Sequence, residues 1–422
     1  RNKLLVSLLV LALVPLVFLG FISRNTSSDA LMNKAFDNLE AARANKVIAI
    51  ENYLYKSESD MNVLLETVRV LRQEAFDQLR SVRTVKKGQL ERYFADRLVD
   101  VQALSANPAV LEALTSFERA SGKIGNSEWR RVEKNKASWL PKYAEQYGYV
   151  DLFLISANGQ VVYTVEKESD MGQNLNRGKL RNSPAGKAFR RGLKDPAIQD
   201  FEAYGPSGGV PAAFVSAPIK AAGKTKGVLM VQLSIDQMNT IMQERTGLGD
   251  TGETYLVGSD KLFRSDSRFV EDSTILDTTY VVDTEGAQAA LSGKTGQKIF
   301  PDYRGTPVLS AYAPLEIQGL QWIILAEISV AEAFAPYVEG QVEDFFTTYK
   351  EAYGYYDLYL FNPDGYLFYT VEHEADLGTN MLNGSYNNTN LARLIKEVLY
   401  TKKFAMADFE RYAPANNAPA AF

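Results

Sequence analysis

The chain has 422 residues, 46% of them hydrophobic, which is enough for about two to four domains with buried cores. Its 46 basic and 51 acidic residues are mixed along the chain and give a formal net charge of -5. This distribution has no basic patch that would favour nucleic acid as a partner. Cysteine is absent, which excludes disulfides, thiolate metal sites and cysteine nucleophiles.

The first 24 residues are predicted to be a membrane anchor. From Leu4 to Phe21 the sequence is almost entirely apolar and carries no charge, and a helix of this length spans a bilayer. Arg1 and Lys3 favour a cytoplasmic N-terminus, although Arg24 weakens this bias. A cleaved secretory signal is the alternative, but the run is long for one and no small-x-small site follows it. In either case we expect the rest of the chain to be periplasmic or extracellular, with the anchor in the cytoplasmic membrane.

The next region, residues 25–117, is predicted to be a long helical stalk. Apolar residues recur there at spacings of three and four, as helices require. Residues 35–39 resemble residues 75–79, which indicates an internal duplication. The basic residues of this helix are interpreted as a solvated face: Arg80, Arg83, Lys86 and Lys87.

A larger repeat determines the predicted architecture. Residues 147–174 match residues 353–380, and the two segments 200–202 and 211–214 recur at 408–410 and 419–422. Each copy reads as a β-hairpin followed by a loop and a short helix. The first copy continues into two more strands, near residues 212–219 and 227–234, whereas the second ends at Phe422 and is expected to be an incomplete sheet.

Between the copies lies a third α/β region. Five segments read as strands and suit a five-stranded antiparallel sheet: 254–257, 262–264, 297–300, 308–314 and 322–328. The predicted fold class is therefore α+β, with an N-terminal membrane helix and a stalk followed by tandem units at residues 118–246, 247–335 and 336–422. Because the first residue is Arg rather than Met, we expect the chain to be a fragment of a longer protein.

These features resemble the double Cache sensor domains of methyl-accepting chemotaxis proteins, sensor kinases and cyclases. Gly252-Glu253-Thr254-Tyr255-Leu256-Val257-Gly258 and the following Arg264-Ser265-Asp266-Ser267-Arg268 look like the membrane-proximal unit, and residues 147–174 with 211–214 look like the distal unit. The resemblance covers residues 76–334. It implies PAS-like units at 118–246 (the distal unit) and 247–335 (the proximal unit), and a truncated distal-type copy at 336–422 (the third segment).

Two departures from the family pattern concern the output and the ligand. A second membrane helix and a coupling domain normally follow the proximal unit, whereas here another distal-type copy begins. Many relatives that sense amino acids carry an Arg-x-Trp-Tyr cluster, and the tryptophans near residues 129–139 lack that spacing. The sequence therefore does not support an amino-acid ligand in particular.

Catalytic and metal chemistry finds little support. The segment 205–209 formally fits a nucleophile elbow, but such a site needs a histidine base, and the one histidine, His373, belongs to the other copy. Two Gly-Lys-Thr tripeptides lack the upstream glycine of a phosphate-binding loop. We therefore predict no catalytic residue, no metal ligand, no cofactor and no enzymatic activity in this chain.

The resemblance implies pockets between each sheet and the loops over it, where polar groups among aromatic residues orient a small ligand. The candidates in the distal unit are Tyr163, Asp170, Asn174, Asp200, Phe201, Tyr204 and Phe214, and those in the proximal unit are Arg264, Asp266, Tyr303 and Tyr312. Alternatives remain open at this point. Tyr163 and Phe214 fit a plain core, the segment 170–174 fits a loop that bonds its own backbone, and Arg264 fits a structural ion pair.

The predicted function is the extracytoplasmic ligand-sensing region of a bacterial transmembrane receptor for signal transduction or chemotaxis. Its expected partners are a small-molecule ligand, the membrane and a second copy of the chain in a homodimer, but no nucleic acid. An exported solute-binding protein and a passive surface stalk are the alternatives. The first would have a cleaved signal, and the second would need no enclosed pocket.

Overall fold

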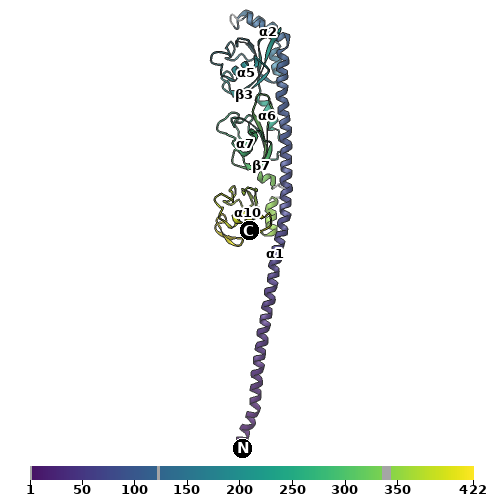
Figure 1. Ribbon diagram of the computed structural model, residues 1–422, viewed down its shortest axis with the longest axis vertical. Coiled ribbons are helices and arrows are strands. Elements are labelled where there is room, and N and C mark those ends of the chain that lie inside the picture. The colour runs from purple at the N-terminus through teal and green to yellow at the C-terminus, as the bar shows by residue number, and fades with distance from the viewer. Residues whose placement is uncertain (1, 121–123, 335–343) are drawn as a thin grey trace. The chain divides into compact units, whose positions relative to one another are not determined.

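The computed structural model describes residues 2–120, 124–334 and 344–422. The chain divides into two compact parts, residues 1–70 and 71–422, and one helix, α1 (Asn2–Ser105), runs from the first into the second (Figure 1). Near its N-terminus α1 has an 18-residue window of mean hydropathy 2.9 whose described residues are exposed. Among the described residues it is the one helix long and apolar enough to cross a membrane.

Short helices follow α1, and asparagine side chains cap the first two of them. Asn107 begins the first of these, accepting a hydrogen bond from the Ala109 amide at 2.9 Å, and a proline occupies its first turn. Gly148 ends the last of them in the left-handed conformation, with φ 70°. These elements are α2 (Pro108–Arg119), α3 (Ser127–Val132), the π-helical turn η1 (Glu133–Ala137) and α4 (Leu140–Tyr147).

The distal unit is built on a five-stranded antiparallel sheet of order β2-β1-β5-β4-β3. Four of its strands lie where the sequence pattern predicts them. The edge strand β3 was not predicted, because polar residues interrupt it. The strands are β1 (Tyr149–Ser156), β2 (Val161–Thr164), β3 (Ala197–Ala203), β4 (Pro211–Ala221) and β5 (Lys224–Leu233), and α5 (Pro184–Gly192) precedes β3.

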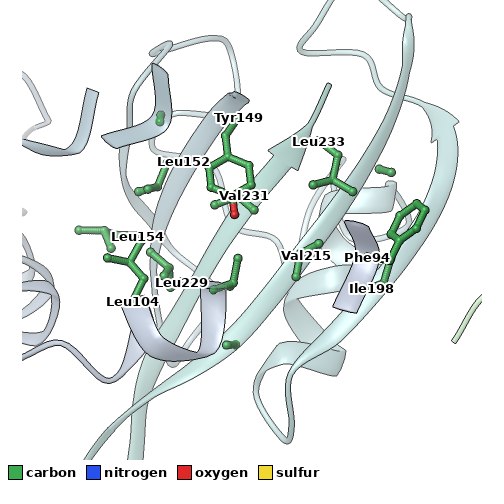
Figure 2. Close-up of a cluster of buried hydrophobic side chains, with 14 of the residues drawn as sticks. Phe94, Leu104, Tyr149, Leu152, Leu154, Ile198, Val215, Leu229, Val231 and Leu233 are labelled. Carbon is green, nitrogen blue, oxygen red and sulfur yellow. The ribbon is translucent and has the colours of Figure 1, made fainter. Parts of the chain in front are cut away.

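The two faces of this sheet bury different cores, because strand side chains alternate between faces. One core joins the sheet to the helices; Figure 2 shows Leu152 and Leu154 of β1 beside Leu229 and Val231 of β5 in it. The opposite face carries a core of Phe153, Phe214 and Met230 with residues of α5 and of the loop after β2. The polar cluster described below lies on this second side.

The proximal unit has a four-stranded antiparallel sheet of order β6-β9-β8-β7. The prediction of a fifth strand at 262–264 is wrong: these residues make only isolated bridges, at Leu262 and Phe263. The segment still bonds to β6, since the Gly258 amide donates to the Leu262 carbonyl and the Arg264 amide to the Leu256 carbonyl, but it is too short to form a strand of the sheet. The elements are α6 (Ile235–Gln243), β6 (Glu253–Gly258), α7 (Glu285–Leu291), β7 (Gly296–Pro301), β8 (Pro307–Pro314), β9 (Trp322–Ser329) and α8 (Val330–Phe334).

The third segment contains two separate two-stranded sheets. In the distal unit, β5 lies between β1 and β4 and so joins the pair β1-β2 to the pair β3-β4 in one sheet. The described residues of the third segment include no strand that corresponds to β5. The expected boundary at 335/336 falls within 335–343, outside the described residues. The elements are α9 (Phe345–Tyr353), β10 (Tyr359–Phe361), β11 (Leu367–Thr370), α10 (Asn390–Thr401), β12 (Glu410–Tyr412) and β13 (Ala418–Ala420).

The interpretation of the basic helix face as solvated is wrong for two of its four residues. Lys86 is buried, and its ammonium donates to the carbonyls of Met242 and Glu244 at 2.9 and 2.6 Å and to the Thr254 hydroxyl at 2.9 Å. Arg83 is also buried against carbonyl groups of the proximal sheet. Both cations therefore anchor α1 to the proximal unit through acceptors that are distant in the sequence.

Candidate functional site

A buried carboxylate on β1 is the first part of the candidate site. Asp151 is 1% exposed. Its Oδ1 accepts hydrogen bonds from the amides of Leu152, Val165 and Glu166 at 2.6, 2.8 and 3.2 Å. Its Oδ2 has no hydrogen-bond partner in the described part of the chain. Burial raises the pKa of Asp151 to about 7, although the backbone donors oppose this, and the charge of Asp170 adds to it.

A second buried carboxylate lies in the loop after β2. The Tyr204 hydroxyl donates to Asp170 Oδ2 at 2.7 Å, and both side chains are fully buried. Asp170 Oδ1 has no partner among the residues that the structure describes. Burial raises the pKa of Asp170, while the Tyr204 hydrogen bond lowers it. The pKa of Tyr204 is raised as well, by burial and by the Asp170 charge, so the phenol keeps its proton and remains a donor.

Gln232 on β5 completes this group. It stands directly opposite Asp151 on β1 and Phe214 on β4, and opposed residues of an antiparallel sheet project from the same face. Gln232 is 3% exposed, and its Oε1 has no partner within residues 2–120, 124–334 and 344–422. Three buried acceptor oxygens, from Asp151, Asp170 and Gln232, thus lack donors in one unit. We call these three residues the acceptor cluster.

The other distal candidates divide between the two faces and the surface. Phe214 packs edge-on against Tyr204 beside the acceptor cluster. Tyr163 instead stacks on Phe117, with ring centroids 5.1 Å apart, in the core that faces the helices. Asn174 is partly exposed, and its side chain bonds backbone groups on both sides of its loop. Of Phe214, Tyr163 and Asn174, only Phe214 lies beside the acceptor cluster.

Asp200 and Arg264, predicted for different pockets, bind each other. Arg264 Nε and a terminal nitrogen donate to the two carboxylate oxygens of Asp200 at 3.0 and 3.2 Å. Arg264 also pairs with Asp260 at 2.9 Å. The indole of Trp322 donates to Asp200 at 3.0 Å and stacks on Phe201. These contacts join β3 of the distal unit to the proximal unit.

The remaining proximal candidates do not form one group. Asp266 accepts from Asn239 of α6 at 2.5 Å and so ties that helix to the loop after β6. Tyr303 shares a hydrogen bond of 2.5 Å with Ser267 and packs edge-on against aromatic side chains. Tyr312 lies on β8, partly buried against the proximal core.

Two residues of the acceptor cluster, Asp151 and Gln232, were not among the predicted site residues. Asp151 had a signal in the sequence, since Asp357 answers it in the repeat. No feature of the sequence pointed to Gln232. It lies beside Asp151 because β1 pairs with β5, which is about 80 positions further along the chain.

The comparison with protein families identifies the fold. The family model of the Cache domain matches residues 67–337, which is more than half of the chain. The chain belongs to the Cache domain family. This confirms the resemblance inferred from the sequence and the α+β class of tandem PAS-like units, and it identifies the chain as a ligand-sensing receptor region.

Solved structures of chemoreceptor ligand-binding domains are similar in fold to this Cache chain. One is from chemoreceptor CtaA of Pseudomonas fluorescens with L-isoleucine (15% identity, 63% of this chain and 97% of that one, TM-score 0.42). Others are from PctB of Pseudomonas aeruginosa with L-Arg (12%, 62% and 98%, 0.41) and Tlp3 of Campylobacter jejuni with 4-methylisoleucine (14%, 64% and 96%, 0.45). No curated protein matches the chain significantly.

The third segment, outside the Cache match, repeats the contacts of the distal Cache unit. Asp357 accepts from the amides of Leu358, Val371 and Glu372, as Asp151 does from its counterparts. The buried hydroxyl of Tyr412 donates to Asp376, as Tyr204 does to Asp170. One oxygen each of Asp357 and Asp376 again lacks a partner among the described residues.

An open hollow on the distal Cache unit lies apart from these groups. It is lined by Lys187, Arg190, Arg191, Lys194 and Gln199, along α5 and β3. None of the predicted site residues lines it. The acceptor cluster, by comparison, is buried.

Proposed function

We propose that the distal Cache unit binds a small ligand through a cationic amino group. The observation that carries this proposal is the set of three buried oxygens without donors: Asp151 Oδ2, Asp170 Oδ1 and Gln232 Oε1. A buried acceptor without a donor costs about 1–3 kcal/mol, and a buried charge without a partner costs more. An ammonium group supplies three N–H donors for the unpartnered oxygens and a positive charge that balances the carboxylates.

The surroundings of the cluster favour a ligand rather than a side chain as the source of that charge. Lys167, which follows β2, pairs with Glu133 at 2.5 Å instead. Glu168 accepts from the Ser207 hydroxyl at 2.8 Å and adds further negative charge near Asp170. Phe214 and Tyr204 supply apolar walls. A few polar groups among aromatic residues are the usual composition of a small-molecule site.

We also propose how occupancy is transmitted. Phe201 of β3 stacks on Trp322 of β9, and Trp322 packs edge-on against Phe94 of α1 with centroids 5.4 Å apart. A ligand that shifts the loop or β3 therefore acts on the helix through three aromatic rings. Such coupling requires that the ligand bind two states with different affinity.

The setting in the cell is part of the same proposal. The apolar segment of α1 anchors the chain in the cytoplasmic membrane, the Cache units lie outside the cytoplasm, and two copies pair. The exposed apolar surface of residues 4–22 supports the anchor, since water does not favour it. Signal sequences share these properties. The size of the mature protein in a membrane fraction therefore distinguishes an anchored receptor from an exported binding protein.

The test is thermal unfolding of the full chain in detergent with small amines. The probes are L-isoleucine, L-arginine and putrescine, and the matched negative probe is N-acetyl-L-isoleucine, which lacks the ammonium. A ligand at one hundred times its dissociation constant stabilises the native state by about 2.7 kcal/mol. We expect at least one amine to raise the melting temperature and the acetylated compound to have no effect.

Variants separate the cluster from the surface. Asp170→Asn is expected to abolish the shift, whereas Asp195→Asn, at an exposed position of the same unit, should preserve it. A shift that survives Asp170→Asn would place the ligand elsewhere. Equal shifts with L-isoleucine and its acetylated form would contradict an ammonium-binding site, and no shift with any amine would favour the passive stalk.

A further inference from the structure

The proximal unit contains a row of polar side chains across three strands of its sheet. Glu253 on β6 stands opposite Glu327 on β9, and Glu327 stands opposite Ser310 on β8. Opposed residues project from the same face. That face otherwise carries the apolar core with Tyr255 and Leu325, so the row is set into a hydrophobic environment.

A third carboxylate joins this row from the turn after β7. One carboxylate oxygen each of Glu253, Asp302 and Glu327 lies within 4.8 Å of the others, and all three residues are buried. Arg304 neutralises Asp302, with its guanidinium 2.6 Å from Asp302 Oδ2. Arg304 also lies close enough to Glu253 to lower its pKa, but neither Glu253 nor Glu327 forms a salt bridge in the part of the chain that the structure describes.

Unpartnered oxygens point to a missing positive group. Glu253 Oε1, Glu327 Oε1 and the Ser310 hydroxyl are buried and make no hydrogen bond of good geometry in the described ranges, although Ser310 lies close enough to Glu327 to lower the pKa of that carboxyl. The second oxygen of each glutamate is held: Tyr255 donates to Glu327 Oε2 at 2.8 Å, and Ser267 to Glu253 Oε2 at 3.1 Å. These donors orient the carboxylates and leave the free oxygens for a ligand.

We propose that Glu253, Asp302 and Glu327, together with the Ser310 hydroxyl, form a binding site for a divalent cation, with Ca²⁺ as the fitting ion. All of the donor atoms are oxygens, which hard cations prefer. At a Ca–O distance of about 2.3–2.6 Å, ligands on opposite sides of the ion are about 5 Å apart. The three carboxylate oxygens lie within 4.8 Å of one another, a spacing that is compatible with three ligands around one such ion.

This site differs from the acceptor cluster in unit and in chemistry. It combines three carboxylates with hydroxyl groups, whereas the distal cluster has two carboxylates and an amide. Burial raises the pKa of Glu253 and raises that of Glu327 to about 8. Protons and a cation therefore compete for the same two glutamates, and protonated glutamates without a metal are the alternative that the experiment must distinguish.

The experiment is titration calorimetry of the full chain in detergent, stripped with chelator and then titrated with CaCl₂ at pH 8, with MgCl₂ in parallel. We expect one Ca²⁺ per chain. Glu253→Gln and Glu327→Gln should each abolish binding, because each removes a ligand charge. Ser310→Ala, which removes a neutral ligand and keeps the sheet, should weaken binding about tenfold or more. Glu271→Gln, at an exposed position of the same unit, is the matched control and should bind normally.

Equilibrium dialysis with ⁴⁵Ca²⁺ up to about 1 mM checks the result independently of heat. Absence of bound Ca²⁺ in the folded wild-type chain would overturn the proposal. Binding that persists in both glutamine variants would overturn it as well. Asp170→Asn should leave Ca²⁺ binding unchanged, so failure of this site and failure of the distal amine site are distinguishable.

Discussion

Replacing Asp151 with asparagine tests whether the acceptor cluster is electrostatically strained without a ligand. Burial raises the pKa of Asp151 from 3.8 to about 7. At about 1.4 kcal/mol per pH unit, this corresponds to at most about 4 kcal/mol of folding free energy. Asparagine keeps an oxygen that can accept from the three backbone amides, but it carries no charge. We therefore expect Asp151→Asn to stabilise the ligand-free chain at pH 8.

The stabilisation expected for Asp151→Asn depends on pH. Since the folded chain binds the Asp151 proton more tightly than the unfolded chain, the contribution of Asp151 to wild-type stability falls as the pH rises from about 4 to 7 and then levels off. The variant lacks this contribution. The difference between the two proteins should be near zero at pH 4 and at most about 4 kcal/mol at pH 8.

The assay is urea unfolding of the full chain in detergent, followed by tryptophan fluorescence, at pH 4, 6 and 8. Trp129 and Trp139 lie in the distal unit and report on it. Asp195→Asn, at an exposed carboxylate of the same unit, is the control and should not change the pH profile. A variant less stable than wild type at pH 8, or a difference that does not change with pH, would refute the reasoning.

Three further substitutions test individual contacts. Tyr204→Phe removes the hydrogen bond to Asp170 and should destabilise the distal unit by about 1.5–3 kcal/mol, measured by urea unfolding. Arg264→Lys loses the two-point contact with Asp200 but keeps the charge, and should cost about 1.5–3 kcal/mol and separate the unfolding of the two Cache units in calorimetry. Lys86→Met leaves three acceptors without their donor and should cost about 1–3 kcal/mol, with faster amide exchange at the end of α6.

Each of these has an outcome that contradicts it. An unchanged urea midpoint for Tyr204→Phe would mean that the phenol does not hold Asp170 in solution. A single unchanged calorimetric transition for Arg264→Lys would show that the ion pair does not couple the units. Unaltered exchange in Lys86→Met would mean that water replaces the ammonium without cost.

Local patterns were sufficient for much of the architecture. The apolar run at residues 4–21, the long helical periodicity and the repeat of 147–174 at 353–380 are visible without a structure, and the family comparison agrees with the Cache units inferred from them. Four strands of the distal sheet also follow from alternation and turns. These features depend on neighbouring residues, whose side-chain spacing and backbone preferences are written directly in the sequence.

The sequence was less informative about the polar groups. It named Asp170, Tyr204 and Phe214, which the structure brings together, but it assigned Asp200 and Arg264 to separate pockets where the structure pairs them. Their role in ligand binding stays a prediction, as do the domain boundaries and the third segment as a copy of the distal unit.

Tertiary structure alone decided which polar atoms have partners. Glu253, Glu327 and Ser310 are adjacent because antiparallel register aligns three strands that are far apart in the chain. Lys86 is buried because carbonyl groups more than 150 positions away accept its hydrogen bonds. The free energy of a buried charge depends on the donors and acceptors around it, and these come from distant segments. The sequence therefore determined the family and most of the elements, while only the packing of those elements decided which buried polar atoms lack partners among the described residues.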